Sequence, residues 1–212
     1  MTDQQQLAPA ALPTLDGLFR RTLAEAADRR ALGEPADKAR VTGAAPRRLT
    51  YAEADRAIAT LATHFAEARL PQGSVVVLQL PNTVEAVLTI LAASRIGLVA
   101  ALLPQLWRQA DLATALNAVG ARAIVACGTI DGVDHADLAM NAAAETFSIR
   151  HVCGFGTRLP DGMVPLDDMP APHAAVTPLP DDVRRAAIVT FDVTPEGLRA
   201  VPRSHAALIA GG

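Results

Sequence analysis

The segment "SVVVLQLPNTVEAVLTILAASRIGLVAALLP", residues 74–104, joins two short apolar runs through an amphipathic stretch. Residues 74–80 are β-branched and typical of a buried strand, residues 83–96 favour a helix, and residues 98–103 favour a second strand. A strand, a crossover helix and a second strand form a βαβ unit, in which the two strands are parallel. This stretch therefore predicts a fold built around a parallel sheet.

The same alternation continues on both sides of this unit. Upstream, Thr14 is the expected N-cap of one helix, and Thr50 with Glu53 forms a capping box for the next. Asn82 and Glu85 repeat that capping pattern before the 83–96 helix, whereas 33–47 is expected as a loop. Downstream, the pattern predicts helices at 109–121 and 134–148 and strands at 122–127, 150–155 and 186–191. The predicted fold class is α/β, a mostly parallel sheet of βαβ units with helices on both faces.

Composition shifts divide the chain into four parts. We expect a disordered lead over 1–13, an α/β N-terminal subdomain over 14–159, and a proline-rich surface connection over 160–182. Residues 183–212 should hold the last strand, a polar loop and a helix that starts at Ser204. A helix starting there has little room, so we expect a cut or naturally truncated product.

Charge and composition exclude several classes of protein. The formal net charge is -3, half of the 212 residues are hydrophobic and only 3% are aromatic, so no nucleic-acid-binding surface is expected. No secretory signal begins the chain, and a cytoplasmic location fits. The mean hydropathy of +0.23 is high, and we expect apolar surface that pairs with a second copy or with a missing domain.

Residues 84–104 are long enough to cross a membrane, which takes about 20 apolar residues. Glu85, Arg95 and a helix-ending Gly97 instead indicate a helix followed by a buried strand, so we expect no membrane span. Cys127 and Cys153 lie in predicted strands and are expected to be small buried hydrophobes, with a redox pair as the alternative.

No residue pattern predicts a metal site or a catalytic group. The five histidines are scattered without ligand spacing, and "DGVDHAD" (131–137) is best explained as the start of a helix. His205 is expected as a neighbour of a helix cap, and Trp107 as a residue that packs over a loop or lines a cleft. We therefore expect no catalytic and no metal-ligating residue in this chain.

The stretch "IVTFDVTPEGLRAVPRSHAAL", residues 188–208, is the one candidate for ligand binding. It begins as a strand, continues as a polar loop and ends at a helix start. A strand that leads into a helix N-terminus presents free amides and a positive dipole end to an anion. This layout predicts a phosphate-binding loop.

Several motifs occur in one order along residues 14–212: "RRLTYAEADRAIATLATHF", the 74–104 segment, "LNAVGARAIVA" and "DDVRRAAIVTF" followed by "RSHAAL". Together they resemble the N-terminal part of the adenylate-forming superfamily, which includes acyl-CoA synthetases. The resemblance implies ATP with Mg as cofactors, and a carboxylic acid and CoA or a carrier thiol as partners. It also implies activation of the acid to an acyl-adenylate, followed by thioester formation.

The family's phosphate loop follows the pattern T-S-G-T-T-G-x-P-K-G, and this chain departs from it. Thr194 is retained, Arg199 replaces the lysine, and Gly197 matches the last loop glycine after a shift of one residue. Asp192 and Glu196 introduce negative charge where the family uses glycines and hydroxyls to bind phosphate. We interpret the loop as degenerate, with cofactor binding through Thr194, Gly197 and Arg199 at most.

Three explanations of this loop stay open: a working ATP site, a vestigial or specialised loop of a larger enzyme, and a plain structural connection. A metal bridging carboxylates and phosphates would favour the first. The family's adenine motif, ribose-binding aspartate and C-terminal catalytic lysine lie beyond this stretch, and Lys38 is the chain's only lysine. We therefore expect no adenylation by this chain alone. Three hypotheses for the chain remain: a segment of an enzyme, a non-catalytic binding module, or an inactive structural fragment.

Overall fold

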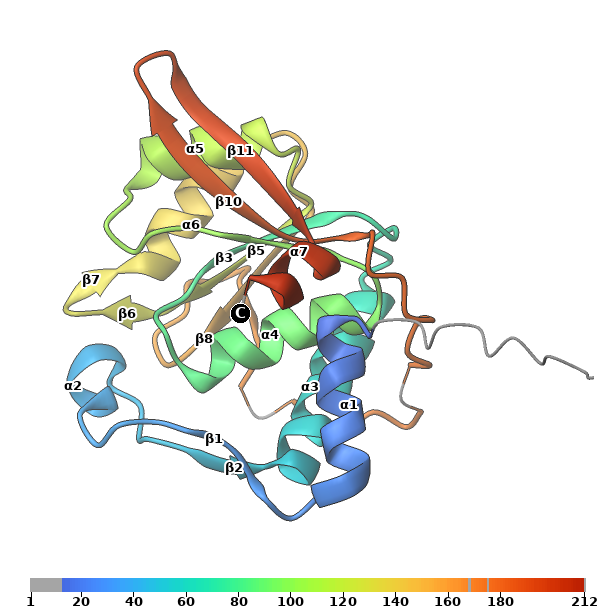
Figure 1. Cartoon of the computed structure of the whole chain (residues 1–212). Helices are drawn as coiled ribbons and strands as arrows, with labels where there is room; N and C mark the ends of the chain where they lie inside the picture. Colours follow the sequence, from blue (N-terminus) through green and yellow to red (C-terminus); the bar gives the residue numbers. More distant parts are fainter. Residues whose placement is uncertain (1–12, 168, 175, 212) are drawn as a thin grey trace, which may run out of the picture.

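The computed structural model describes residues 13–167, 169–174 and 176–211, so most of the lead expected over 1–13 lies outside the described residues. Within these ranges, seven strands form the main sheet in the order β11-β10-β4-β3-β5-β8-β9 (Figure 1). Their bounds are β3 Val75–Gln79, β4 Val99–Leu102, β5 Ala123–Cys127, β8 His151–Phe155, β9 Val164–Pro165, β10 Ala186–Thr194 and β11 Gly197–Ser204.

The five strands predicted from the sequence are all present, and those of them that pair with one another do so in parallel. The chain passes from β3 to β4, and then returns across β3 to β5 on the other side. The order of the strands therefore reverses between β3 and β5. β11 is antiparallel to β10 and lies at the edge of the sheet.

Helices cover both faces of the sheet, as predicted (Figure 1). Val76, Leu78 and Val125 pack with α3 and α4, whereas Val77 and Ile124 pack with α5 and α6 on the opposite face. Neighbouring residues of a strand face opposite sides, so strands of continuous valine and isoleucine suit a sheet buried on both faces. The helices are α1 Leu15–Ala26, α2 Lys38–Thr42, α3 Tyr51–Glu67, α4 Val84–Arg95, α5 Gln109–Ala118, α6 His135–Ala144 and α7 His205–Ala210.

Of the three helix starts predicted before residue 100, two are confirmed and one is wrong. Thr14 accepts a hydrogen bond from the Gly17 amide, and Thr50 and Glu53 form the complete capping box of α3. The N-cap of α4 is Thr83 rather than Asn82, and its side chain does not cap the helix. The first amide of α4 instead donates to Glu34, which comes from a distant part of the chain.

Two segments expected as connections contain regular structure. The 33–47 stretch holds α2 and borders a small antiparallel pair, β1 Arg30–Gly33 and β2 Arg48–Thr50. Within 160–182, β9 pairs with β8 at the edge of the main sheet, and Leu166 beside it is buried. Proline fits there because an edge strand leaves one row of amides unpaired. A second small pair, β6 Thr129–Ile130 and β7 Val133–Asp134, precedes α6.

Other local predictions are confirmed. Gly97 ends α4 with a φ of +74°, a conformation that favours glycine. Cys127 and Cys153 are buried free thiols, and burial raises the pKa of Cys153 to about 12. Among the described residues, none of the helices is long and apolar enough to cross a membrane.

A buried ion cluster joins α1, α3 and α4. The guanidinium of Arg95 donates to Asp16 at 2.8 Å and to Asp55 at 2.6 Å, and Arg20 donates to the second oxygen of Asp16. Arg95 and Asp16 are almost fully buried, at 4% and 1% exposure. A buried charge that loses its partner is strongly unfavourable, so this cluster holds α1 against the helical layer.

Replacing Arg95→Met should therefore lower the free energy of unfolding by about 3 kcal/mol, because Asp16 and Asp55 would lose their buried cation. Arg184→Met is the matched control, since Arg184 pairs with Asp182 on the surface and should change stability by less than about 0.5 kcal/mol. Urea unfolding measures both. Equal effects of the two changes would contradict the assigned role of Arg95.

The two ends of the described chain meet at His205. Its Nδ1 accepts a hydrogen bond of 3.2 Å from the Leu15 amide, and its side chain is buried. Burial, together with the positive charge of Arg185, lowers the pKa of His205 against the opposing effect of Asp181 and Asp182. The folded state therefore favours the neutral imidazole, which can accept this bond.

Since the pKa of His205 is lower in the folded state than its ordinary 6.5, its contribution to stability is complete above pH 6.5. That contribution should decrease as the pH falls through the folded-state pKa. Urea unfolding between about pH 8 and about pH 5 measures this loss. His205→Asn should reduce the pH dependence of the free energy of unfolding, because the asparagine oxygen can accept the hydrogen bond from the Leu15 amide without titrating. The exposed His173→Asn should leave that pH dependence unchanged. An unchanged profile in His205→Asn would contradict the assignment.

Candidate functional site

The candidate phosphate loop is a β-hairpin in this structure. β10 continues through Thr194, β11 begins at Gly197, and only Pro195 and Glu196 form the turn between them. The hairpin projects from the end of the sheet (Figure 1). The expected passage from loop to helix is therefore wrong, because the eight residues of β11 separate the turn from α7. Ser204 does cap α7, as predicted, but that helix start is remote from the turn.

The three residues expected to bind phosphate lie at the tip of this hairpin. The Thr194 hydroxyl donates to the Gly197 carbonyl at 3.0 Å, and Gly197 has a φ of +126°. Arg199 faces Asp192 in the strand register and donates to its carboxylate at 2.7 Å. The structure thus brings Thr194, Gly197 and Arg199 together, but each contributes to closing the hairpin.

The electrostatics of the tip oppose an anion. Arg199 is already paired with Asp192, and Glu196 is exposed on the turn. A phosphate would have to compete with Asp192 for the guanidinium.

Trp107 packs edge to face against Phe191, with 5.8 Å between ring centroids, so it anchors β10 to the segment after β4.

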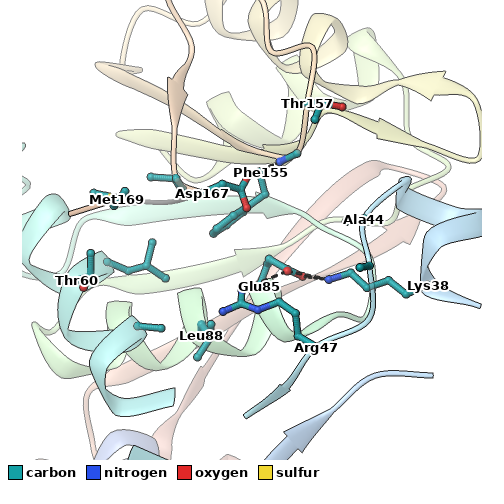
Figure 2. A pocket seen from close by; sticks show the side chains of 15 residues that line it. Lys38, Ala44, Arg47, Thr60, Glu85, Leu88, Phe155, Thr157, Asp167 and Met169 are labelled. Carbon is teal, nitrogen blue, oxygen red and sulfur yellow. Dashed lines mark hydrogen bonds and ion pairs between the residues drawn. The ribbon is translucent and has the colours of Figure 1, made fainter. Parts of the chain in front are cut away.

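A cavity of about 660 Å³ lies elsewhere on the sheet, where β8 ends (Figure 2). Its walls come from α3, α4, the segment before β2, and residues 155–157, 166, 167 and 169. Leu61, Leu88, Phe155 and Leu166 are buried side chains that form much of its apolar surface. A smaller recess extends it towards Leu80 and Cys127 at the ends of β3 and β5.

A buried group of charges forms one side of this cavity (Figure 2). Lys38 is 4% exposed, and its ammonium donates to Glu34 at 2.9 Å and to both oxygens of Glu85 at 2.8 and 3.0 Å. Arg47 approaches Glu85 at 3.6 Å, and its amide donates to Glu34. Burial is the largest single influence on the pKa of Glu85 and raises it. The hydrogen bonds from Lys38, from the backbone and from Thr83, together with the positive charge of Lys38, outweigh burial, and the pKa is lowered.

Sequence reasoning missed this group. Glu85 was interpreted as part of a capping pattern, and its actual partner lies 47 residues earlier. The one available signal was that Lys38 is the only lysine. Among the described residues, no group of three or more His, Cys, Asp or Glu side chains could hold a metal ion.

Most of the chain matches one known protein family. Residues 19–187 match a family model described as AMP-binding enzyme. No curated protein matches the chain by sequence.

Solved structures with a similar fold include three ligases. The anthranilate CoA ligase AuaEII in complex with anthranoyl-AMP has a TM-score of 0.78 and 15% identity, over 93% of this chain and 36% of that chain. Acetoacetyl-CoA synthetase from Streptomyces lividans has a TM-score of 0.81 and 19% identity, over 93% and 31%. The acyl-CoA synthetase of Brucella canis has a TM-score of 0.67 and 24% identity, over 87% and 32%. These likenesses establish the fold, and the chain spans about a third of each of these proteins.

Removal of the buried cation beside the cavity should destabilise the chain. Lys38→Met would leave Glu34 and Glu85 without their main partner, and we expect a loss of about 3 kcal/mol in the free energy of unfolding. Adding Glu85→Gln should restore part of it, because one buried carboxylate is then neutral. Arg40→Met, which removes an exposed pair with Asp37, is the control and should have little effect. Urea unfolding in which the double variant is no more stable than Lys38→Met would contradict the assignment.

Proposed function

Since the chain belongs to the AMP-binding enzyme family, we propose that it is the N-terminal segment of an AMP-forming acyl-CoA synthetase-like ligase. Such a ligase uses ATP with Mg to convert a carboxylic acid to an acyl-adenylate, and then transfers the acyl group to CoA or a carrier thiol. The observation that carries the proposal is the family match over residues 19–187, together with a parallel sheet of the same architecture as known acyl-CoA ligases.

The chain by itself does not carry out this reaction under our proposal. If the hairpin tip corresponds to the family's phosphate loop, as we propose, Asp192 and Glu196 add two carboxylates to it. Each unit charge about 5 Å from a phosphate charge opposes it by roughly 3 kcal/mol at an effective dielectric of about 20. Exposure of both side chains to solvent weakens this repulsion. Arg199 offsets about one of these two charges, because its ion pair with Asp192 is neutral overall, and the charge of Glu196 remains. The hairpin is thus a degenerate form of the family's phosphate loop.

The rest of such an enzyme would supply the adenine, ribose and acyl contacts. Self-association, or packing with that missing part, stays a prediction; Leu106, Phe147 and Val193 are large apolar side chains exposed in this structure. A cytoplasmic location also stays a prediction. A non-catalytic binding module is the alternative, and the structure offers no observation that favours it.

Titration calorimetry with Mg-ATP tests the proposal for this chain. We expect no saturable heat at millimolar ATP, because the Thr194 hydroxyl already donates to Gly197, the Arg199 guanidinium is paired with Asp192, and Glu196 adds negative charge at the tip. The matched variant carries Asp192→Ser, Val193→Gly and Glu196→Gly, which restore the family's residue types. It should bind ATP no more weakly than the unchanged chain.

Micromolar binding by the unchanged chain would overturn the proposal that the hairpin is a degenerate phosphate loop, as would a loss of affinity in the triple variant. A loss of affinity in the triple variant would also show that the changed residues take part in binding, for example if the carboxylates hold a metal that bridges to the phosphates.

A further inference from the structure

The cavity lies where the topology of the sheet leaves room for a ligand. In open parallel sheets, a crevice forms at the carboxyl ends of the strands where the strand order reverses. Here the reversal falls between β3 and β5, and the recess beside Leu80 and Cys127 opens at the carboxyl ends of these two strands. The larger cavity continues from it past Phe155 at the end of β8. Its volume of about 660 Å³ lies in the range of small-molecule sites.

The inner surface of the cavity is apolar. Leu61 and Leu88 come from α3 and α4, and Phe155 and Leu166 come from β8 and the segment that follows β9. All four are at most 6% exposed, and Met169 also lines the cavity. These side chains suit the alkyl or aryl part of a ligand.

The charges around the cavity leave one carboxylate in excess. Lys38 and Arg47 line the cavity and carry two positive charges. Glu85, which also lines it, and Glu34, which contacts Lys38 but is not a lining residue, carry two negative charges. Asp167 also lines the cavity, and its described hydrogen bond is to the Gly156 amide. Because Asp167 is solvent-exposed, it belongs to the mouth of the cavity rather than to its interior.

The environment of Cys127 agrees with an excess of negative charge. Burial is the main cause that raises the pKa of this thiol, and the charges of Glu85 and Asp167 raise it further. Cys127 lines the recess that joins the larger cavity. The pair of carboxylates therefore disfavours another negative charge in this region.

We propose that this cavity binds a small amphipathic amine, whose ammonium group pairs with Asp167 at the mouth while its apolar body contacts Leu61, Leu88 and Leu166. The two ends of the ligand then match the two kinds of surface, one charged and wet, the other apolar and dry. This site is separate from the β10–β11 hairpin, and it does not depend on the proposed ligase function.

Three probes of nearly equal size and different charge test this assignment. n-Hexylamine is cationic at neutral pH, n-hexanol is neutral and hexanoate is anionic. Calorimetry or saturation-transfer NMR on the whole chain should show that n-hexylamine binds at least about threefold more tightly than n-hexanol, as an exposed ion pair allows. Hexanoate should bind most weakly.

Two variants, each with a matched control, test where the probe binds. Asp167→Asn should weaken n-hexylamine binding by about threefold or more and leave n-hexanol unchanged, because its amide oxygen can still accept the Gly156 bond. Asp161→Asn, an exposed change in the same segment, is the control and should leave both unchanged. Ala57→Phe should fill the cavity and weaken both probes, whereas Ala66→Phe on the exposed end of the same helix should not.

Thermal unfolding of each variant verifies that it remains folded. The proposal is overturned if none of the probes binds saturably, or if hexanoate binds as tightly as n-hexylamine, since Arg47 rather than Asp167 would then dominate. It is equally overturned if Asp167→Asn and Asp161→Asn bind n-hexylamine alike. None of these results bears on ATP binding at the hairpin.

Discussion

The burial of β3 on both faces is the constraint from which the rest of the architecture follows. Val76 and Val77 point to opposite sides of the sheet, and neither is exposed. A strand with apolar residues on both sides is stable only if both faces are covered, which parallel βαβ units achieve with their crossover helices. Because these strands are parallel, their carboxyl ends all lie along one common edge of the sheet.

That common edge explains where the two candidate sites lie. β10 runs parallel to β4, so the hairpin leaves the sheet at the same edge to which β3, β5 and β8 bring their carboxyl ends. The hairpin tip is closed by Asp192 and Arg199, and the cavity beside β8 is bounded by Lys38 and Glu85. The same edge therefore holds both the hairpin, which we propose to be a degenerate phosphate loop, and the cavity, which we propose to bind an amine.

The elements that the sequence predicted well depend on neighbouring residues. The Thr50–Glu53 capping box and the apolar strand at 75–79 are encoded within a few positions, and the structure agrees with both. In contrast, Glu34 accepts a hydrogen bond from the Val84 amide, 50 positions away, and Lys38 donates to Glu85, 47 positions away. No local pattern reveals such pairs.

The prediction of a loop at residues 192–199 was wrong for a different reason. Asp192, Pro195 and Gly197 favour a loop by composition, and that composition concealed the strand alternation of Phe191 and Val193 with Leu198 and Ala200. Residues 186–194 and 197–204 are strands because they pair with each other. The β propensities of single residues do not reveal such pairing. The resemblance to a family with a phosphate loop reinforced the same interpretation.

The account rests most directly on the paired state of residues 186–204. NMR measurement of cross-strand nuclear Overhauser contacts tests it without any ligand. We predict contacts between residues 191 and 200 and between residues 193 and 198, the partners in the antiparallel register. Absence of these contacts, together with rapid amide exchange along the whole of 188–203, would show an open loop and contradict the account.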